Sequence, residues 1–392
     1  MSYQINWSLA GDDMTPEKFL NEYWQKKPLF IRGAITNEEG YFVVPIDADE
    51  LAGLAMEEDI QSRIVGQKNQ QTWFVEHGPF DDFSQFGEEY WTLLVQATNH
   101  WSTSTQAMLT PFRFIPNWRI DDVMVSFSTP NGGVGPHLDQ YDVFIIQGQG
   151  KRRWQVGLPD ESLETVIPHC DLKQVSPFTP IIDVITQTGD LLYIPPNHPH
   201  NGVSLENSVN YSIGFQAPSN KELWSGFADT IIDKNLGEHR FADADRTITY
   251  QPERIKAADF QALKDFMLTT LNNEESFNHF ICQHLTQNHH SLDIVAADDE
   301  DEQYSVEELD TLFKEAKYIV PINGLKSLFN EVNNNLYVNG EMYILTDVQV
   351  DFAIALAKNE PLTIKQLKSF KLCLKNKQLL TSLLNNGYWY IE

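Results

Sequence analysis

Short runs in which hydrophobic and polar residues alternate fill the chain between residues 119 and 218. A period of two predicts strands that turn one face toward a core and the other toward polar surroundings. Clusters of Gly, Pro and Asn separate the runs, in the turns PNGGVGP, QGQG, TGD and PPNHP. Strands that are this short and this regularly spaced predict a β-sandwich or a β-barrel.

Helical signals lie on both sides of this region. Thr15, Pro16 and Glu17 predict the start of a helix that runs through FLNEYWQKK to Pro28, and the following LFIRGAI is strand-like. Residues 46–115 mix helical and irregular signals. A capping box, SNKE, opens a second helical region at residue 219. Hydrophobic residues at helical spacing there form three stripes: Leu223, Phe227 and Ile231; Phe260, Leu263, Met267 and Leu271; and Phe277, Phe280, Ile281 and Leu285.

The three stripes predict helices outside the barrel, which form either a small core of their own or a dimer interface. The charged stretch DIVAADDEDEQ then predicts a linker. A helix capped at Ser305, the strand-like YIVPI and LYVNGEMYIL, two helical segments and a closing NGYWYIE strand fit a compact α+β unit of the winged-helix type. The predicted division is 1–217 for the barrel, 218–290 for the helices, 291–304 for the linker and 305–392 for the winged-helix-like domain.

Charge, cysteine content and apolar run length exclude several classes of protein. The chain carries 55 acidic and 28 basic residues, a net charge of -27, so its surface would repel a nucleic-acid backbone, and no direct nucleic-acid partner is expected. Its 3 cysteines are far apart, which argues against both a disulfide framework and a cysteine metal site. We see neither a secretory signal nor an apolar run long enough to span a membrane, and we expect a cytoplasmic protein.

A candidate metal site lies in GVGPHLDQYDVFII. His137 and Asp139 are two residues apart, so in an extended segment both side chains point to the same side. The Pro-rich bend YIPPNHPH offers a further imidazole, from either His198 or His200. Two histidines and one carboxylate with open coordination positions are typical of non-haem Fe(II) oxygenases. The H-x-D pattern is short, however, and a lone histidine is more often an ordinary core residue.

Alternation extends the site beyond these ligands. In KRRWQVG, Arg152 falls on the mostly apolar side of its strand, where it needs an anionic partner from the protein or from a ligand. Polar residues of two other strands also share a side, and Tyr141 shares its side with His137 and Asp139. If these sides face the barrel interior, the cavity contains Asp122, Met124, Ser126, Ser128, Asn210 and Ser212.

The segments GVGPHLDQYDVFIIQGQGKRRWQVG, GDLLYIPPNHPH and NYSIGFQAP resemble the Jumonji-C type bacterial ribosomal oxygenases, and more narrowly the arginine hydroxylases of large-subunit ribosomal protein sixteen. The resemblance covers nearly the whole chain. It implies an α+β protein with a double-stranded β-helix (cupin-like, Jumonji-C) catalytic barrel, a helical segment that forms a homodimer, and a C-terminal winged-helix-like domain. The implied reaction uses 2-oxoglutarate and dioxygen to hydroxylate an arginine of a ribosomal protein.

The resemblance also implies a role for each candidate residue. His137, Asp139 and His200 would hold Fe(II), and Arg152 would bind the distal carboxylate of 2-oxoglutarate, with Ser126 and Asn210 beside it. Asp122, Met124 and Tyr141 would line the pocket for the substrate arginine. Asn197 and His198 stand where relatives have a glycine and an aromatic residue, and Asn197 tolerates the backbone angles that such a bend requires.

Three alternatives remain at the level of sequence. The same chemistry could act on a histidine or on a methylated lysine. The barrel could be a catalytically silent cupin-like module that binds ribosomal proteins through its acidic surface. Finally, the winged-helix-like domain could bind DNA, although its lysines fit a solvated helix face better: Lys365, Lys368, Lys371, Lys375 and Lys377.

Overall fold

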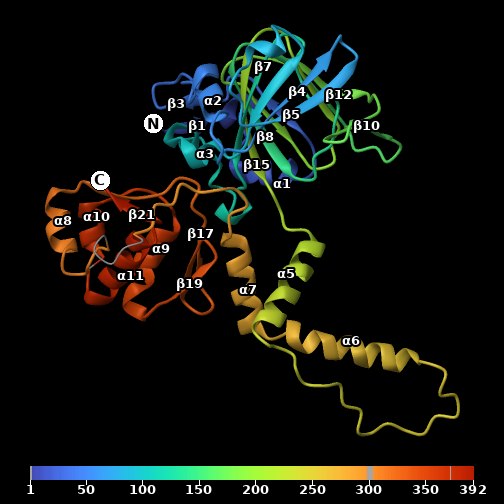
Figure 1. The fold of residues 1–392 in the computed structure, drawn as a ribbon, viewed down its shortest axis with the longest axis vertical. Helices are drawn as coiled ribbons and strands as arrows, with labels where there is room; N and C mark the ends of the chain where they lie inside the picture. Colours follow the sequence, from blue (N-terminus) through green and yellow to red (C-terminus); the bar gives the residue numbers. More distant parts are fainter. Residues whose placement is uncertain (1, 298–302, 371) are drawn as a thin grey trace.

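The computed structural model describes residues 2–297, 303–370 and 372–392, and at its centre two antiparallel sheets face each other (Figure 1). The larger sheet has the order β2 (Leu29–Ile31), β13 (Leu191–Ile194), β8 (Asp142–Gln149), β15 (Ser208–Phe215), β7 (Val123–Ser128), β6 (Trp91–Val95), β4 (Ser62–Lys68) and β5 (Thr72–His77). The smaller sheet has the order β12 (Pro180–Thr186), β9 (Arg152–Gly157) and β14 (His200–Ser204). Two short sheets accompany them, β1 (Tyr3–Ile5) with β3 (Ile35–Asn37) and β10 (Thr165–His169) with β11 (Leu172–Val175).

The central strands of the larger sheet are buried on both faces, which explains the continuous apolar run in β8. On one face, Phe144 and Tyr211 pack in a large core with residues of α1 (Pro16–Glu22) and α2 (Ala48–Leu54). On the other face, Val143 and Ile145 pack against Trp154 of the smaller sheet. The cavity between the two sheets opens at the end of this second core.

The structure corrects several sequence-based predictions in the N-terminal half. Residues 46–115, predicted to be helical or irregular, contain three strands that extend the larger sheet, together with α2 and the short helices α3 (Thr98–Trp101) and α4 (Thr103–Ala107). Helix α1 ends at Glu22 instead of continuing to Pro28, because Gln25 takes a φ of 57° and its N–H donates to the Tyr193 hydroxyl. LFIRGAI divides into β2 and β3 around Gly33, whose φ is 61°.

The helical region forms an arm that extends away from the barrel (Figure 1). Its helices are α5 (Asn220–Asp233), α6 (Ala257–Leu271) and α7 (Glu274–Thr286), and the predicted capping box at Ser219 and Glu222 is present. Helix α6 has no buried residue, so its stripe does not pack inside this chain. Phe260 is 61% exposed and Met267 is 69% exposed.

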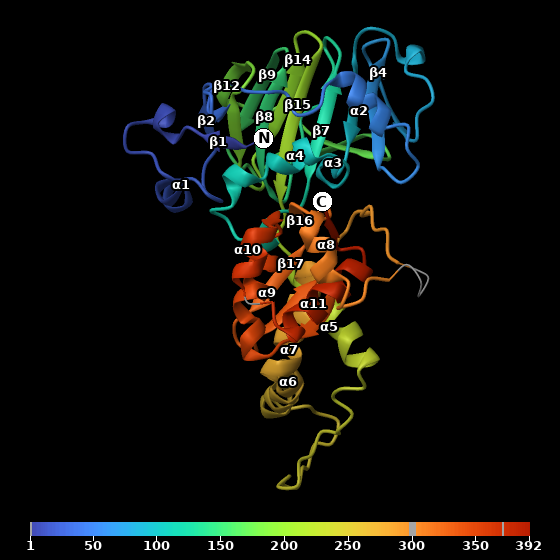
Figure 2. The same cartoon turned by 90° about the vertical axis from the view of Figure 1, so that its left-hand side faces the viewer.

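The C-terminal domain has its own core and lies beside the arm (Figures 1 and 2). Its predicted first helix begins at Leu309 rather than next to Ser305, and three helices follow the β18–β19 hairpin where two were predicted. Part of the predicted acidic linker, residues 298–302, lies outside the described residues. The elements are α8 (Leu309–Glu315), β16 (Tyr318–Pro321), β17 (Ser327–Asn330), β18 (Asn335–Val338), β19 (Glu341–Ile344), α9 (Val350–Ala357), β20 (Leu362–Thr363), α10 (Ile364–Ser369), α11 (Leu374–Asn385) and β21 (Trp389–Ile391).

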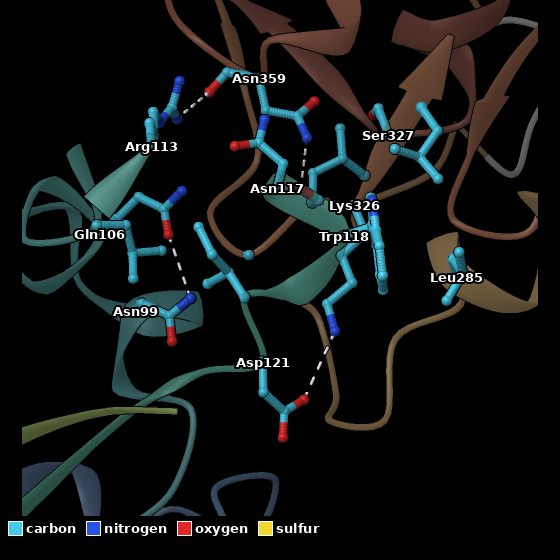
Figure 3. Close-up of a pocket in the computed structure, with 15 residues that line it drawn as sticks. Asn99, Gln106, Arg113, Asn117, Trp118, Asp121, Leu285, Lys326, Ser327 and Asn359 are labelled. Carbon is cyan, nitrogen blue, oxygen red and sulfur yellow. Dashed lines mark hydrogen bonds and ion pairs between the residues drawn. The ribbon is translucent and has the colours of Figure 1, made fainter. Parts of the chain in front are cut away.

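Polar contacts join the C-terminal domain to the barrel (Figure 3). Arg113 donates a hydrogen bond of 2.9 Å to the Lys358 carbonyl and pairs with Glu360. Lys326 Nζ lies 3.6 Å from Asp121 Oδ1. The cavity between these contacts holds about 50 Å³, which is room for one or two water molecules and too little for an organic ligand.

Candidate active site

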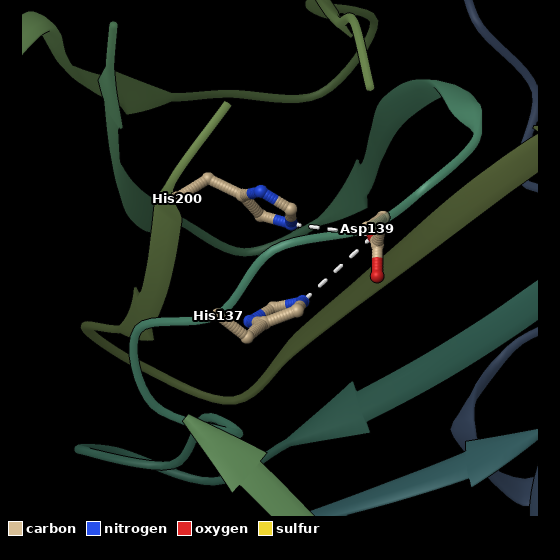
Figure 4. A group of neighbouring side chains, drawn as sticks. All are labelled: His137, Asp139 and His200. Atoms are coloured by element: carbon tan, nitrogen blue, oxygen red, sulfur yellow. Dashed lines mark ion pairs between the residues drawn. The ribbon is translucent and has the colours of Figure 1, made fainter. Parts of the chain in front are cut away.

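The two predicted imidazoles and the carboxylate meet at the mouth of the barrel (Figure 4). His137 precedes β8 and His200 begins β14, and each backbone N–H donates to the carbonyl of the other residue over 3.0 Å. Asp139 Oδ2 lies 3.9 Å from His137 Nε2 and 3.5 Å from His200 Nε2. The ligand atoms thus surround one point from two distant segments of the chain.

The hydrogen bonds of both imidazoles fit a metal site. His137 Nδ1 lies 2.9 Å from the Gly135 carbonyl, and His200 Nδ1 lies 3.0 Å from the His198 carbonyl. A carbonyl can only accept, so each Nδ1 carries the proton and each Nε2 presents a lone pair toward Asp139. Burial lowers the pKa of His200 to about 4, which keeps this imidazole in the neutral form that a metal requires.

His198, the other candidate at the bend, is not part of this group. Its Nδ1 lies 3.1 Å from the Pro196 carbonyl, and its buried Nε2 has no hydrogen-bond partner in the described part of the chain. Asn197 takes the left-handed conformation, with a φ of 61°, that the bend requires. The turn therefore directs the His200 imidazole toward Asp139 and leaves His198 outside the group.

Arg152 lies at the base of the cavity and is 4% exposed. Its guanidinium donates to the hydroxyls of Ser126, Ser128 and Ser208 over 3.3, 2.7 and 3.1 Å. Across the described ranges no carboxylate forms an ion pair with it, and burial lowers its pKa to about 9. A buried guanidinium that donates to hydroxyls and has no anionic partner can bind an anion, and its planar shape suits a carboxylate.

The cavity between these groups has a volume of about 570 Å³, enough for a cosubstrate and the end of a side chain. Asn210 does not line it. This residue is buried next to Ser126 on the neighbouring strand and donates to Gln147 Oε1 over 3.0 Å. Ser128, also predicted to face the cavity, does not line it, and its hydroxyl accepts a hydrogen bond from Arg152 instead. The other predicted residues line the cavity: Asp122, Met124, Ser126, His137, Asp139, Tyr141, Arg152, His200 and Ser212.

Asp122 brings a second buried ionisable group into the cavity. Its carboxylate accepts a hydrogen bond of 2.7 Å from the Ala97 N–H, and its Oδ2 lies 3.9 Å from His290 Nε2. Burial raises the pKa of Asp122 to about 7 because the charged form loses its water. A cation that enters the cavity would restore the favourable interaction that the carboxylate has lost.

Sequence reasoning missed several polar residues that line the same cavity, among them Arg63, Gln174 and His290. Arg63 comes from β4, in the stretch whose strands were not predicted, although SRIVGQK does contain a partial alternation. Gln174 comes from β11. His290 follows α7 and reaches the cavity from a segment assigned to the helical region, and no local pattern marks it.

Two protein-family models match separate parts of the chain. Residues 107–223 match the JmjC domain family, and residues 269–390 match the ROXA-like winged helix family. These matches confirm the predicted double-stranded β-helix barrel and the predicted winged-helix-like domain. None of the helices in the described part of the chain combines the length and apolar character that a bilayer crossing requires.

The chain is 41% identical over 394 residues to the ribosomal protein uL16 3-hydroxylase of Escherichia coli, with 100% of both chains covered. It is 33% identical to a probable ribosomal oxygenase of Haemophilus influenzae, over 84% of this chain and 82% of that protein. The crystal structure of the E. coli protein YcfD matches with a TM-score of 0.90 and 41% identity over 100% of both chains.

A second structure of YcfD, in complex with cobalt and 2-oxoglutarate, matches with a TM-score of 0.86 and 39% identity, again over 100% of both chains. Identity at this level over the full length shows the family, and the triad, the buried arginine and the cavity agree with its chemistry. This chain therefore belongs to the Jumonji-C ribosomal oxygenases, the dioxygenases that use Fe(II) and 2-oxoglutarate.

Proposed function

We propose that the enzyme hydroxylates an arginine side chain of a large-subunit ribosomal protein. The observation that carries this proposal is the buried Asp122 carboxylate, which lines the same cavity as the metal ligands. Among the residues that the structure describes, its one partner at ion-pair distance is the imidazole of His290. The similarity to the E. coli uL16 3-hydroxylase supports the choice of substrate. A ribosomal protein substrate would also place the reaction in the cytoplasm.

His137, Asp139 and His200 would hold Fe(II) through the two Nε2 atoms and one carboxylate oxygen. When bound, the metal supplies the activation of dioxygen that couples the loss of carbon dioxide from 2-oxoglutarate to hydroxylation. The overall reaction converts dioxygen, 2-oxoglutarate and a C–H bond into succinate, carbon dioxide and C–OH. One of the two oxygen atoms ends in the new carboxylate of succinate and the other in the hydroxyl group, while the carbon dioxide comes from the carboxylate next to the keto group of 2-oxoglutarate.

Arg152 would bind the distal carboxylate of 2-oxoglutarate. Two parallel N–H···O bonds replace the water that the carboxylate gives up, and the hydroxyls of Ser126 and Ser128 can reorient to donate to it. The guanidinium is already buried and held in place, so little order has to be created when the cosubstrate binds. Asn210 was predicted to lie beside the cosubstrate, but its role would be indirect. It pairs with Ser126 on the neighbouring strand and would help to position that residue.

The substrate arginine would enter past Tyr141, whose side chain is 39% exposed at the cavity. Asp122 would pair with the guanidinium, Met124 would contact the aliphatic stem, and the Tyr141 ring would lie against the guanidinium plane. These contacts would hold a substrate C–H bond next to the metal, and closing the cavity would exclude water.

Mass spectrometry of ribosomal proteins incubated with the purified enzyme, Fe(II) and 2-oxoglutarate tests the proposal. We expect a gain of one oxygen on an arginine, together with the formation of succinate. A gain on a histidine or on a methylated lysine, with turnover that survives Asp122→Ala, would assign a different substrate. If no succinate forms with any ribosomal protein, the barrel is a binding module.

The arm fits a second copy of this chain as its partner, and we propose a homodimer. Besides the exposed residues of α6, the arm exposes Trp224 and Ile232 of α5, by 48% and 70%. A surface patch of this kind is usually covered in solution.

A further inference from the structure

Four side chains with metal-binding atoms meet at the rim of the barrel, apart from the triad. His169, Cys170 and Asp171 form the turn between β10 and β11, and their ligand atoms all lie within 4.8 Å of one another. His77, the last residue of β5 in the larger sheet, lies beside this group, with its Nε2 3.7 Å from Asp171 Oδ2. We propose that these four residues form a second metal site that binds zinc.

The distances between the ligand atoms fit a tetrahedral ion. Cys170 Sγ lies 3.4 Å from Asp171 Oδ2 and 3.6 Å from His169 Nδ1. Asp171 Oδ2 lies 3.7 Å from His169 Nδ1 and 3.7 Å from His77 Nε2. Zinc bonds of about 2.0–2.3 Å place neighbouring ligand atoms of a tetrahedron about 3.3–3.8 Å apart, and the ligand atoms of His169, Cys170 and Asp171 already have this spacing. To bind the ion, His169 Nδ1 would give up the hydrogen bond of 3.2 Å that it accepts from the Asp171 N–H, and His77 would move closer to complete the site.

The chemistry of the set selects zinc and distinguishes this site from the triad. One thiolate, two imidazoles and one carboxylate complete four-coordination, as in structural zinc sites, whereas the triad lacks sulfur and leaves positions open. Cys170 and Asp171 are exposed, so the ion has a path from solvent. On binding, the Cys170 thiol releases its proton to solvent and the thiolate becomes a ligand.

Zinc at this point would join the hairpin of β10 and β11 to the larger sheet. The hairpin forms a separate two-stranded sheet, and such a pair has little stability of its own. Yet it supports the segment that carries His137: Gln174 donates to the Val134 carbonyl over 2.8 Å, and the Val175 N–H donates to the Pro136 carbonyl over 2.9 Å. Asp171 also lines the catalytic cavity, so the ion would hold one wall of that cavity in place.

Cobalt titration of the full-length protein tests the second site without any measurement of activity. In the double variant His137→Ala/His200→Ala, the triad is removed, and we expect one equivalent of Co(II) to bind with a thiolate-to-cobalt absorption band. Zn(II) should displace the cobalt and abolish the band. Adding Cys170→Ser to the double variant should remove both the band and the bound equivalent.

Two further variants make the assignment specific. Cys373→Ser removes another exposed cysteine and should leave the band unchanged. His77→Ala, on a different strand, should weaken Co(II) binding at least about tenfold. The proposal is overturned if the double variant shows no thiolate band, or if the band persists after Cys170→Ser. Circular dichroism of each variant checks that the barrel has folded.

Discussion

Asp122→Asn tests the electrostatics of the substrate pocket, because it removes one buried negative charge and keeps a carbonyl oxygen in place. The Asp122 carboxylate accepts a hydrogen bond of 2.7 Å from the Ala97 N–H, and the Asn carbonyl can accept the same bond. Burial raises the pKa of Asp122 from 3.8 to about 7. The substitution therefore separates the effect of the charge from the effect of the hydrogen bond.

The stability change follows from this pKa. A carboxyl with a raised pKa holds its proton more tightly in the folded than in the unfolded state, so the free energy of unfolding falls as the pH rises from about 4 to about 7. Three pKa units correspond to about 4 kcal/mol. As the pH rises from about 4 to about 8, the free energy of unfolding of Asp122→Asn should therefore increase relative to that of the wild type by up to about 4 kcal/mol. Denaturant unfolding at a series of pH values measures this difference.

Activity should change in the opposite direction. Without the charge, the pocket loses its ion pair with the substrate guanidinium, and kcat/KM should fall at least about 100-fold, or roughly 2.7 kcal/mol. In the wild type, kcat/KM should rise with pH up to about 7, since only ionised Asp122 attracts the cation. A variant with the wild-type dependence of stability on pH would refute the raised pKa. A variant with full turnover would refute the pairing with arginine.

Three other substitutions address the remaining parts of the enzyme. Arg152→Met should raise the KM for 2-oxoglutarate at least about 100-fold, measured by cosubstrate titration, because the carboxylate loses a bidentate partner; an unchanged KM would place the cosubstrate elsewhere. Phe260→Asp combined with Met267→Asp should convert a dimer to a monomer in light scattering, and a mass equal to that of the wild type would contradict the proposed interface. His200→Ala should abolish stoichiometric Fe(II) binding in a calorimetric titration, whereas His198→Ala should retain it; the reverse result would exchange the two roles.

Local alternation and spacing were sufficient to predict part of the polar lining of the barrel. Arg152 was placed on the apolar side of its strand, and the structure buries it without a carboxylate partner. His137 and Asp139 were placed on one side of the chain, and their ligand atoms lie 3.9 Å apart. These features depend on the two-residue period of an extended backbone, which any short segment expresses by itself.

The features that the sequence did not predict depend on packing between segments that are far apart in the chain. Strands β4, β5 and β6 are stabilised by pairing at the edge of the sheet: β6 pairs with β7, β4 pairs with β6, and β5 pairs with β4. The composition of residues 46–115 does not reveal that pairing. His290 reaches the cavity only because the chain returns to the barrel after α7. The pKa of Asp122 depends on burial by groups from several elements, and the exposed stripe of α6 depends on where the arm leaves the barrel. Such properties arise from contacts between distant segments, and no local window of sequence contains them.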